Sequence, residues 1–94
     1  MRTIHKYTIF NFDATHDRTS LMLPVNAEIL TAAVQPNPER IVVWAMVDTE
    51  EMKSSREIVL VGTGHEIPRL PLRFIGTCQL ADPALVLHVF EVTK

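Results

Sequence analysis

The sequence predicts an all-β fold with at most one short helix, arranged as a small antiparallel β-sandwich or a partly open β-barrel of six to seven strands. Short segments rich in β-branched and aromatic residues recur along the chain, and turn-forming residues separate them. No segment of about ten residues or more carries the apolar period of an amphipathic helix. Such strands bury their apolar faces by packing as two sheets or as one curved sheet.

The expected strands follow one another closely, and Ala27–Gln35 is the only one for which a helix stays open. Its alanines favour a helix, but Pro36 and Pro38 end the segment promptly. The first two strands should form a hairpin, because the polar segment Asn11–Arg18 between them is turn-prone. The expected strands are Arg2–Phe10, Ser20–Leu23, Ala27–Gln35, Ile41–Val47, Glu57–Val61, Leu72–Leu80 and Ala84–Val92.

The unbroken apolar run Ile41–Val47 indicates a central strand that is covered on both faces or has one face at a partner interface. The polar segment Asp48–Arg56 after it should be a solvated hairpin loop, with room for a one-turn helix. Trp44, Phe74 and Phe90 lie within expected strands and should be core aromatics, with a partner-facing position for some of them as the alternative.

The expected strand Leu72–Leu80 has an alternating pattern, and Asp82-Pro83 after it forms a natural turn. Cys78 is the only cysteine, so the chain forms no internal disulfide, and we expect a small core residue rather than a nucleophile. One face of this strand should carry Leu72, Phe74, Gly76, Cys78 and Leu80.

Composition indicates a globular domain, and we expect a single domain over residues 1–94. The apolar fraction of 47% and the charged fraction of 21% exclude wholesale disorder. The net charge of −2 and the scattered basic residues argue against a nucleic-acid partner. No apolar run approaches the length of about 18 residues that a membrane span needs, and the N-terminal residues lack a signal sequence. We therefore expect neither membrane insertion nor secretion.

The segment Gly62-Thr63-Gly64-His65, at the end of an apolar strand, is the best candidate for a ligand site. Glycine permits positive φ and close backbone approach, and the hydroxyl and imidazole supply polar groups. Backbone N–H groups there could cradle a phosphate or carboxylate, with Arg69 or Arg73 balancing its charge. The alternative is a β-bulge or tight corner that needs glycine for its shape alone.

No catalytic residue, metal site or cofactor can be assigned from the sequence. The four histidines, His5, His16, His65 and His88, follow no spacing typical of a metal site. No GxSxG motif is present, and a hydrolase assisted by His65 would need a second positioned group that the sequence does not identify.

Several segments resemble a family of small proteins of unknown function found mainly in tailed bacteriophages and prophages. The resemblance covers nearly the whole chain, although family members often carry an aromatic residue and a proline where this chain has Val61 and Glu66. It implies a phage or prophage origin and the cytoplasm of an infected host bacterium, and it transfers no activity. The resembling pieces are Thr3–Tyr7, Pro24–Leu30, Trp44–Asp48, Gly62–His65 with Ile67-Pro68, Phe74–Thr77 and His88–Glu91.

The leading functional hypothesis is a phage accessory protein that binds and neutralises a host factor, with a counter-defence role. The factor would be a host protein, contacted by a strand edge or by Ile67–Leu72, or a small anionic, nucleotide-like ligand. The alternative is a structural or assembly-associated protein that forms a homodimer or higher homo-oligomer through strand pairing, which the run Ile41–Val47 motivates.

Overall fold

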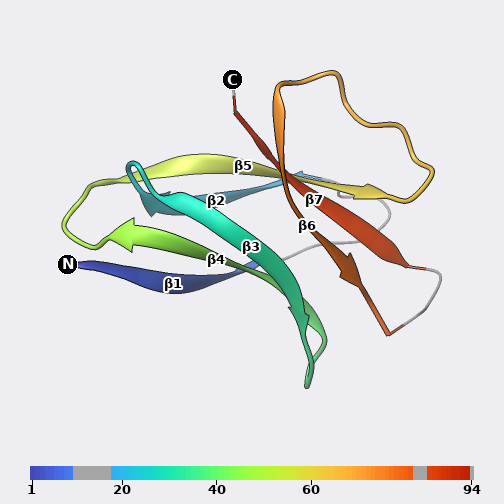
Figure 1. Ribbon diagram of the computed structural model, residues 1–94, viewed down its shortest axis with the longest axis horizontal. Coiled ribbons are helices and arrows are strands. Elements are labelled where there is room, and N and C mark those ends of the chain that lie inside the picture. The colour runs from blue at the N-terminus through green and yellow to red at the C-terminus, as the bar shows by residue number, and fades with distance from the viewer. Residues whose placement is uncertain (10–17, 82–84, 94) are drawn as a thin grey trace.

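A computed structural model describes residues 1–9, 18–81 and 85–93, and these residues form seven strands and no helix (Figure 1). The described part of the chain thus contains no helix that could cross a membrane. Phe10 and the Asp82-Pro83 turn lie outside the described residues. The strands are β1 (Arg2–Ile9), β2 (Arg18–Pro24), β3 (Glu28–Gln35), β4 (Arg40–Asp48), β5 (Lys53–Gly62), β6 (Leu72–Gln79) and β7 (Val86–Val92).

The strands form two antiparallel sheets, in the orders β1-β4-β3 and β2-β5-β7-β6. The sheets do not close into a barrel, so the expected all-β sandwich is confirmed. Buried apolar side chains from every strand meet between the sheets. They include Ile9, Leu21, Leu23, Ile29, Ala32, Ile41, Val43, Ile58, Leu60, Ile75, Cys78 and Val89.

The expected hairpin of the first two strands is wrong, because β1 and β2 belong to different sheets. β1 pairs with β4 and β2 pairs with β5, so each finds its partner far along the chain. The connection after β4 is also no hairpin loop, because β4 and β5 lie in different sheets and β5 already begins at Lys53. The second half of the polar segment Asp48–Arg56 belongs to β5, because its residues from Lys53 onward pair with β2.

The ambiguous third segment is a strand, β3, and the apolar run after it is the central strand β4 of its sheet. A register shift between Ile29 and Thr31 lets both Ile29 and Ala32 reach the core, although they are three residues apart. Residues at alternate positions of β4, such as Ile41 and Val43, face the core.

A second bulge, between Phe74 and Gly76, changes which residues of β6 face the core. Ile75 and Cys78 are buried, whereas Phe74 has 55% of its surface exposed. The prediction that Phe74 shares a face with Cys78 is therefore wrong, because one extra residue reverses the alternation. Burial raises the pKa of the Cys78 thiol, and the expected role of Cys78 as a core residue is confirmed.

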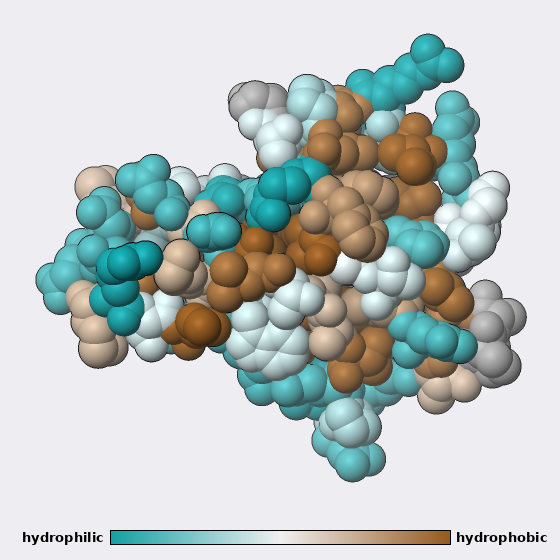
Figure 2. Space-filling view, viewed as in Figure 1, coloured by the Kyte–Doolittle hydropathy of each residue, from teal (hydrophilic) through white to brown (hydrophobic). Residues whose placement is uncertain are grey.

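The prediction of an aromatic core is also wrong. Trp44 and Phe90 are half-buried, Phe74 is exposed, and the buried core of the described residues is aliphatic apart from Cys78. The Phe74 and Phe90 rings instead contact each other edge to face, with centroids 5.5 Å apart. Figure 2 shows hydrophobic side chains gathered where β3 and β6 lie side by side, and a further group beside the segment 63–71.

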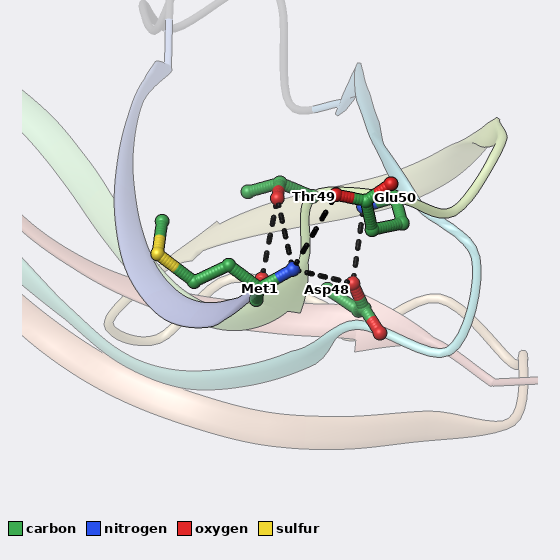
Figure 3. A network of polar contacts seen from close by, with 4 residues as sticks. All are labelled: Met1, Asp48, Thr49 and Glu50. Carbon is green, nitrogen blue, oxygen red and sulfur yellow. Dashed lines mark hydrogen bonds and ion pairs between the residues drawn. The ribbon is translucent and has the colours of Figure 1, made fainter.

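Polar contacts at Met1 join the start of β1 to the end of β4 (Figure 3). The α-amino group lies 3.3 Å from both Asp48 Oδ1 and Thr49 Oγ1, and the Thr49 amide donates to the Met1 carbonyl oxygen. The Glu50 amide donates to the Asp48 carboxylate and, together with the α-amino group, lowers the pKa of Asp48. These contacts hold the β1 edge in register at the end of its ladder.

The close approach of β6 to β3 depends on Gly76. A Cβ at this position would lie 3.3 Å from the carbonyl oxygen and 3.4 Å from the amide nitrogen of Ala32, and this backbone cannot move aside without disturbing β3. We expect Gly76→Val to lower the free energy of unfolding by about 1–3 kcal/mol, measured by urea denaturation. Gln79→Val, at an exposed position of the same strand, is the control. An unchanged midpoint for Gly76→Val would contradict this account.

Candidate functional site

The predicted glycine segment forms a tight turn where β5 ends. The His65 amide donates to the Gly62 carbonyl oxygen over 3.0 Å, and Gly64 has a φ of 87°. A positive φ at the third residue and this hydrogen bond are the marks of a type II turn, which favours glycine there. Gly62 leaves room for the exposed His65 ring, since a Cβ on it would lie 2.9 Å from Nδ1 of His65 and the ring would have to shift. The His65 ring therefore folds back over Gly62.

A second imidazole, that of His88 on β7, is held beside this turn by two threonines. Its Nε2 lies 2.8 Å from Thr63 Oγ1 and its Nδ1 lies 3.0 Å from Thr77 Oγ1. In the sheet, His88 stands opposite Val61 of β5 and Thr77 of β6. Each ring nitrogen of His88 thus has a threonine hydroxyl as its partner, and a hydroxyl can donate or accept. This pair of contacts fixes the plane of the ring.

The turn, the segment after it and β7 together enclose a cleft of about 310 Å³. The segment 63–71 leaves the sheet and returns to β6, forming the long orange arc in Figure 1. The threonine and the two imidazoles supply the polar groups of the cleft, and the rest of its wall is mainly apolar. The lining residues are Val61, Gly62, Thr63, Gly64, His65, Ile67, His88 and Phe90.

Four of the six predicted ligand-binding residues, Gly62 to His65, thus lie together, whereas the two arginines lie outside the cleft lining. Arg69 is exposed, and Arg73 lines a different depression. The backbone is also less open to an anion than the sequence suggests. The Thr63 amide donates to the Val86 carbonyl oxygen and the His65 amide to that of Gly62. His88 is the member that sequence reasoning missed, although the period-two pattern of β7 places it on the same face as Phe90.

A second polar arrangement lies at the other end of the β5–β7 pair, where Glu91 is buried between two arginines. The Glu91 side chain is 5% exposed; its Oε2 lies 2.5 Å from Arg56 Nε, and its Oε1 lies 3.4 Å from Arg73 Nη2. Each guanidinium also donates to a carbonyl oxygen at the start of β3. Arg56 Nη1 lies 2.9 Å from the Ala27 oxygen, and Arg73 Nη2 lies 2.8 Å from the Ile29 oxygen.

This arrangement, the Arg56–Glu91–Arg73 cluster, could not be found from local patterns. Arg56 and Arg73 are 35 and 18 residues away from Glu91 in the sequence. The one signal is that Glu91 continues the inward row of Leu87 and Val89 on β7, where a lone carboxylate would need partners. Within the described ranges, no group of three or more His, Cys, Asp or Glu side chains is placed to hold a metal ion.

Comparison with known proteins yields one match. A family model described as "Domain of unknown function (DUF7352)" matches residues 1–94. No curated protein and no solved structure matches the chain. A match over the whole chain agrees with the expected family of unknown function, whereas the phage origin stays a prediction.

The Arg56–Glu91–Arg73 cluster should contribute strongly to stability, because removing the shared charge leaves two guanidinium groups without their carboxylate. We expect Glu91→Gln to lower the free energy of unfolding by about 3 kcal/mol. This value is at the low end of the cost of breaking a buried ion pair, because Arg73 is partly exposed. Glu57→Gln, which removes an exposed ion pair with Arg18, should cost less than about 1 kcal/mol. If chemical denaturation showed that Glu91→Gln and Glu57→Gln lower the free energy of unfolding equally, the stabilising role of the cluster would be contradicted.

Proposed function

Because the chain belongs to the DUF7352 family, whose function is unknown, we propose a function from the site itself: the protein is a small binding protein that holds a compact, nucleotide-like ligand in the cleft. The observation that carries this proposal is the placement of two imidazoles against an apolar wall, one of them held by two threonine hydroxyls. A cleft of about 310 Å³ is at the small end of the range for ligand pockets, which favours a small ligand.

The chemistry of the lining suits a flat heterocyclic ring. Phe90 and Ile67 offer apolar surface to the face of the ring. Thr63 and His65 can exchange hydrogen bonds with the ring edge or with an attached anionic group. Because neither Arg69 nor Arg73 lines the cleft, the ring should supply more of the affinity than the anionic group does.

The same geometry favours binding over catalysis. General acid–base chemistry normally needs an imidazole oriented by a carboxylate, with one nitrogen directed at the reacting group. Both ring nitrogens of His88 contact threonine hydroxyls, and the residues that line the cleft include no carboxylate. The arrangement therefore orients a ring without activating it.

The biological role we propose is capture of a host molecule in the cytoplasm of an infected bacterium, which would withdraw that molecule from the host and serve counter-defence. The resemblance to proteins of tailed bacteriophages supports this setting. The cleft, whose lining includes no carboxylate, supports capture rather than turnover.

Binding at the cleft can be tested by NMR titration with ribonucleosides, their monophosphates and inorganic phosphate. We expect the nucleosides and nucleotides, but not phosphate alone, to shift the signals of Gly64, His65 and His88. His65→Ala should weaken binding about tenfold, as expected for loss of one hydrogen bond and its ring contact. His5→Ala, an exposed position on β1 of the other sheet, is the matched control. The proposal would be contradicted if the NMR signals that shift belonged only to residues outside the cleft, or if His65→Ala left the affinity unchanged.

A second candidate function is assembly into a homo-oligomer through the outer face of the β1-β4-β3 sheet. Ile4 is 56% exposed there and stands opposite Met46, next to the pair of Lys6 and Trp44. Partly exposed apolar residues on a central strand and its neighbour are typical of a protein contact surface. This observation favours a homo-oligomer that forms through a sheet face, whereas the sequence predicts one that forms by strand pairing; both edges of β4 are already paired.

Assembly can be tested by light scattering across a concentration series. If the β1-β4-β3 face carries the contact, the protein should have the mass of a dimer or larger species, and Ile4→Glu should return it to a monomer because the added charge would be buried. Met22→Glu changes a similarly exposed residue of β2 in the other sheet and should leave the mass unchanged. A monomeric wild type at high concentration would exclude this function.

A further inference from the structure

The β5 strand is paired on both edges over only part of its length. β2 pairs with its residues 53–59, whereas β7 pairs with residues 58–62. Beyond Glu91, β7 follows β6 instead: Val92 stands opposite Leu72, and the Thr93 amide donates to the Pro71 carbonyl oxygen over 2.9 Å. Residues 55–57 therefore have no strand partner on the β7 side within the described chain, and a wedge opens between β5 and the end of β7.

This wedge coincides with a surface depression of about 600 Å³, almost twice the volume of the cleft. Its lining combines the unpaired part of β5 with the end of β7, the start of β3 and the Arg56–Glu91–Arg73 cluster. The lining residues are Ala27, Glu28, Ser55, Arg56, Glu57, Arg73, Glu91, Val92 and Thr93.

The arginines of the cluster keep donors beyond those that the protein uses. Arg73 donates through Nη2, and Arg56 donates through Nε and Nη1. Among the described residues, nothing accepts from Nε or Nη1 of Arg73, or from Nη2 of Arg56. The Arg73 side chain is 44% exposed, so its planar guanidinium can donate hydrogen bonds to a carboxylate that occupies the depression.

The rim of the wedge carries negative charge, opposite to that of the arginines. Glu28 is exposed and forms no ion pair within the described residues, while Glu57 is paired with Arg18 at 3.1 Å. A simple anion on Arg73 would therefore lie near Glu28 without compensation. A ligand that carries a cation beside its carboxylate would satisfy both groups.

We propose that the wedge binds the carboxyl-terminal end of an extended peptide that carries a basic side chain. The peptide backbone adds as a short strand along residues 55–57 of β5, which have an unpaired edge. Its terminal carboxylate accepts hydrogen bonds from Arg73, and its basic side chain pairs with Glu28. Strand addition, carboxylate recognition and charge pairing thus come from three neighbouring features of one depression, and none of them involves the cleft.

Three pentapeptides that differ in one group each test this proposal. The first, Val-Thr-Lys-Val-Ala, has a free carboxylate; the second ends in an amide; the third has Glu in place of Lys. We expect the first peptide to bind in NMR titrations up to millimolar concentration and to shift the amides of residues 55–57. The amide and Glu peptides should each bind at least about tenfold more weakly, as for one lost charge-assisted contact.

Two matched variants assign these contacts to side chains. Arg73→Lys keeps the charge but loses the planar fork, and it should weaken binding of the first peptide, whereas Arg69→Lys outside the depression should not. Glu28→Gln should remove the preference for Lys over Glu and leave the preference for carboxylate over amide. Equal binding of carboxylate and amide peptides by the wild-type protein would overturn the proposal, as would the absence of shifts at residues 55–57.

Discussion

The interaction on which the arrangement of the two sheets depends is the sharing of Glu91 by Arg56 and Arg73. Burying a carboxylate costs free energy unless charge and hydrogen bonds compensate it, and here two guanidinium groups do so. Arg73 also donates to a carbonyl oxygen of β3, in the opposite sheet, and Arg56 donates to that of Ala27, the residue before β3. The carboxylate therefore holds in place two arginines that link the sheets at one end of the sandwich. Further along, β3 lies against β6, where a Cβ on Gly76 would come within 3.3 Å of the carbonyl oxygen of Ala32.

The register of β7 connects this link with the cleft. Glu91 and Val89 face inward, while His88 and Phe90 line the cleft on the other face of the strand. A slip of one residue would exchange the two sets, placing an imidazole in the core and a carboxylate on the surface. The two threonine contacts of His88 and the two arginine contacts of Glu91 are satisfied in the same register, so each pair of contacts disfavours the slip that would break the other.

The parts of the structure that local sequence determines could be predicted, and those that depend on distant partners could not. β-branched runs and prolines identify the strands, and the glycine spacing identifies the corner at residues 62–65, because these preferences act within a few residues. The pairing of strands could not be predicted in this way. β1 and β2 follow each other in the sequence, yet their backbones form hydrogen bonds in two different sheets. The bulge that exposes Phe74 and the partners of Glu91 likewise depend on β3, β5 and β6 coming together.

The short ladder between β5 and β7 explains why both candidate sites lie where they do. The two strands pair only over residues 58–62 of β5, and a different candidate site lies at each end of this ladder. At one end the chain turns at Gly62 and its continuation encloses the cleft. At the other end β7 follows β6, and the uncovered edge of β5 becomes a wall of the wedge. If β7 paired with β5 as far as residue 55, the backbone hydrogen bonds of β5 would be satisfied, but β7 would fill the wedge. A peptide can add as a strand there only because this edge of β5 is unpaired.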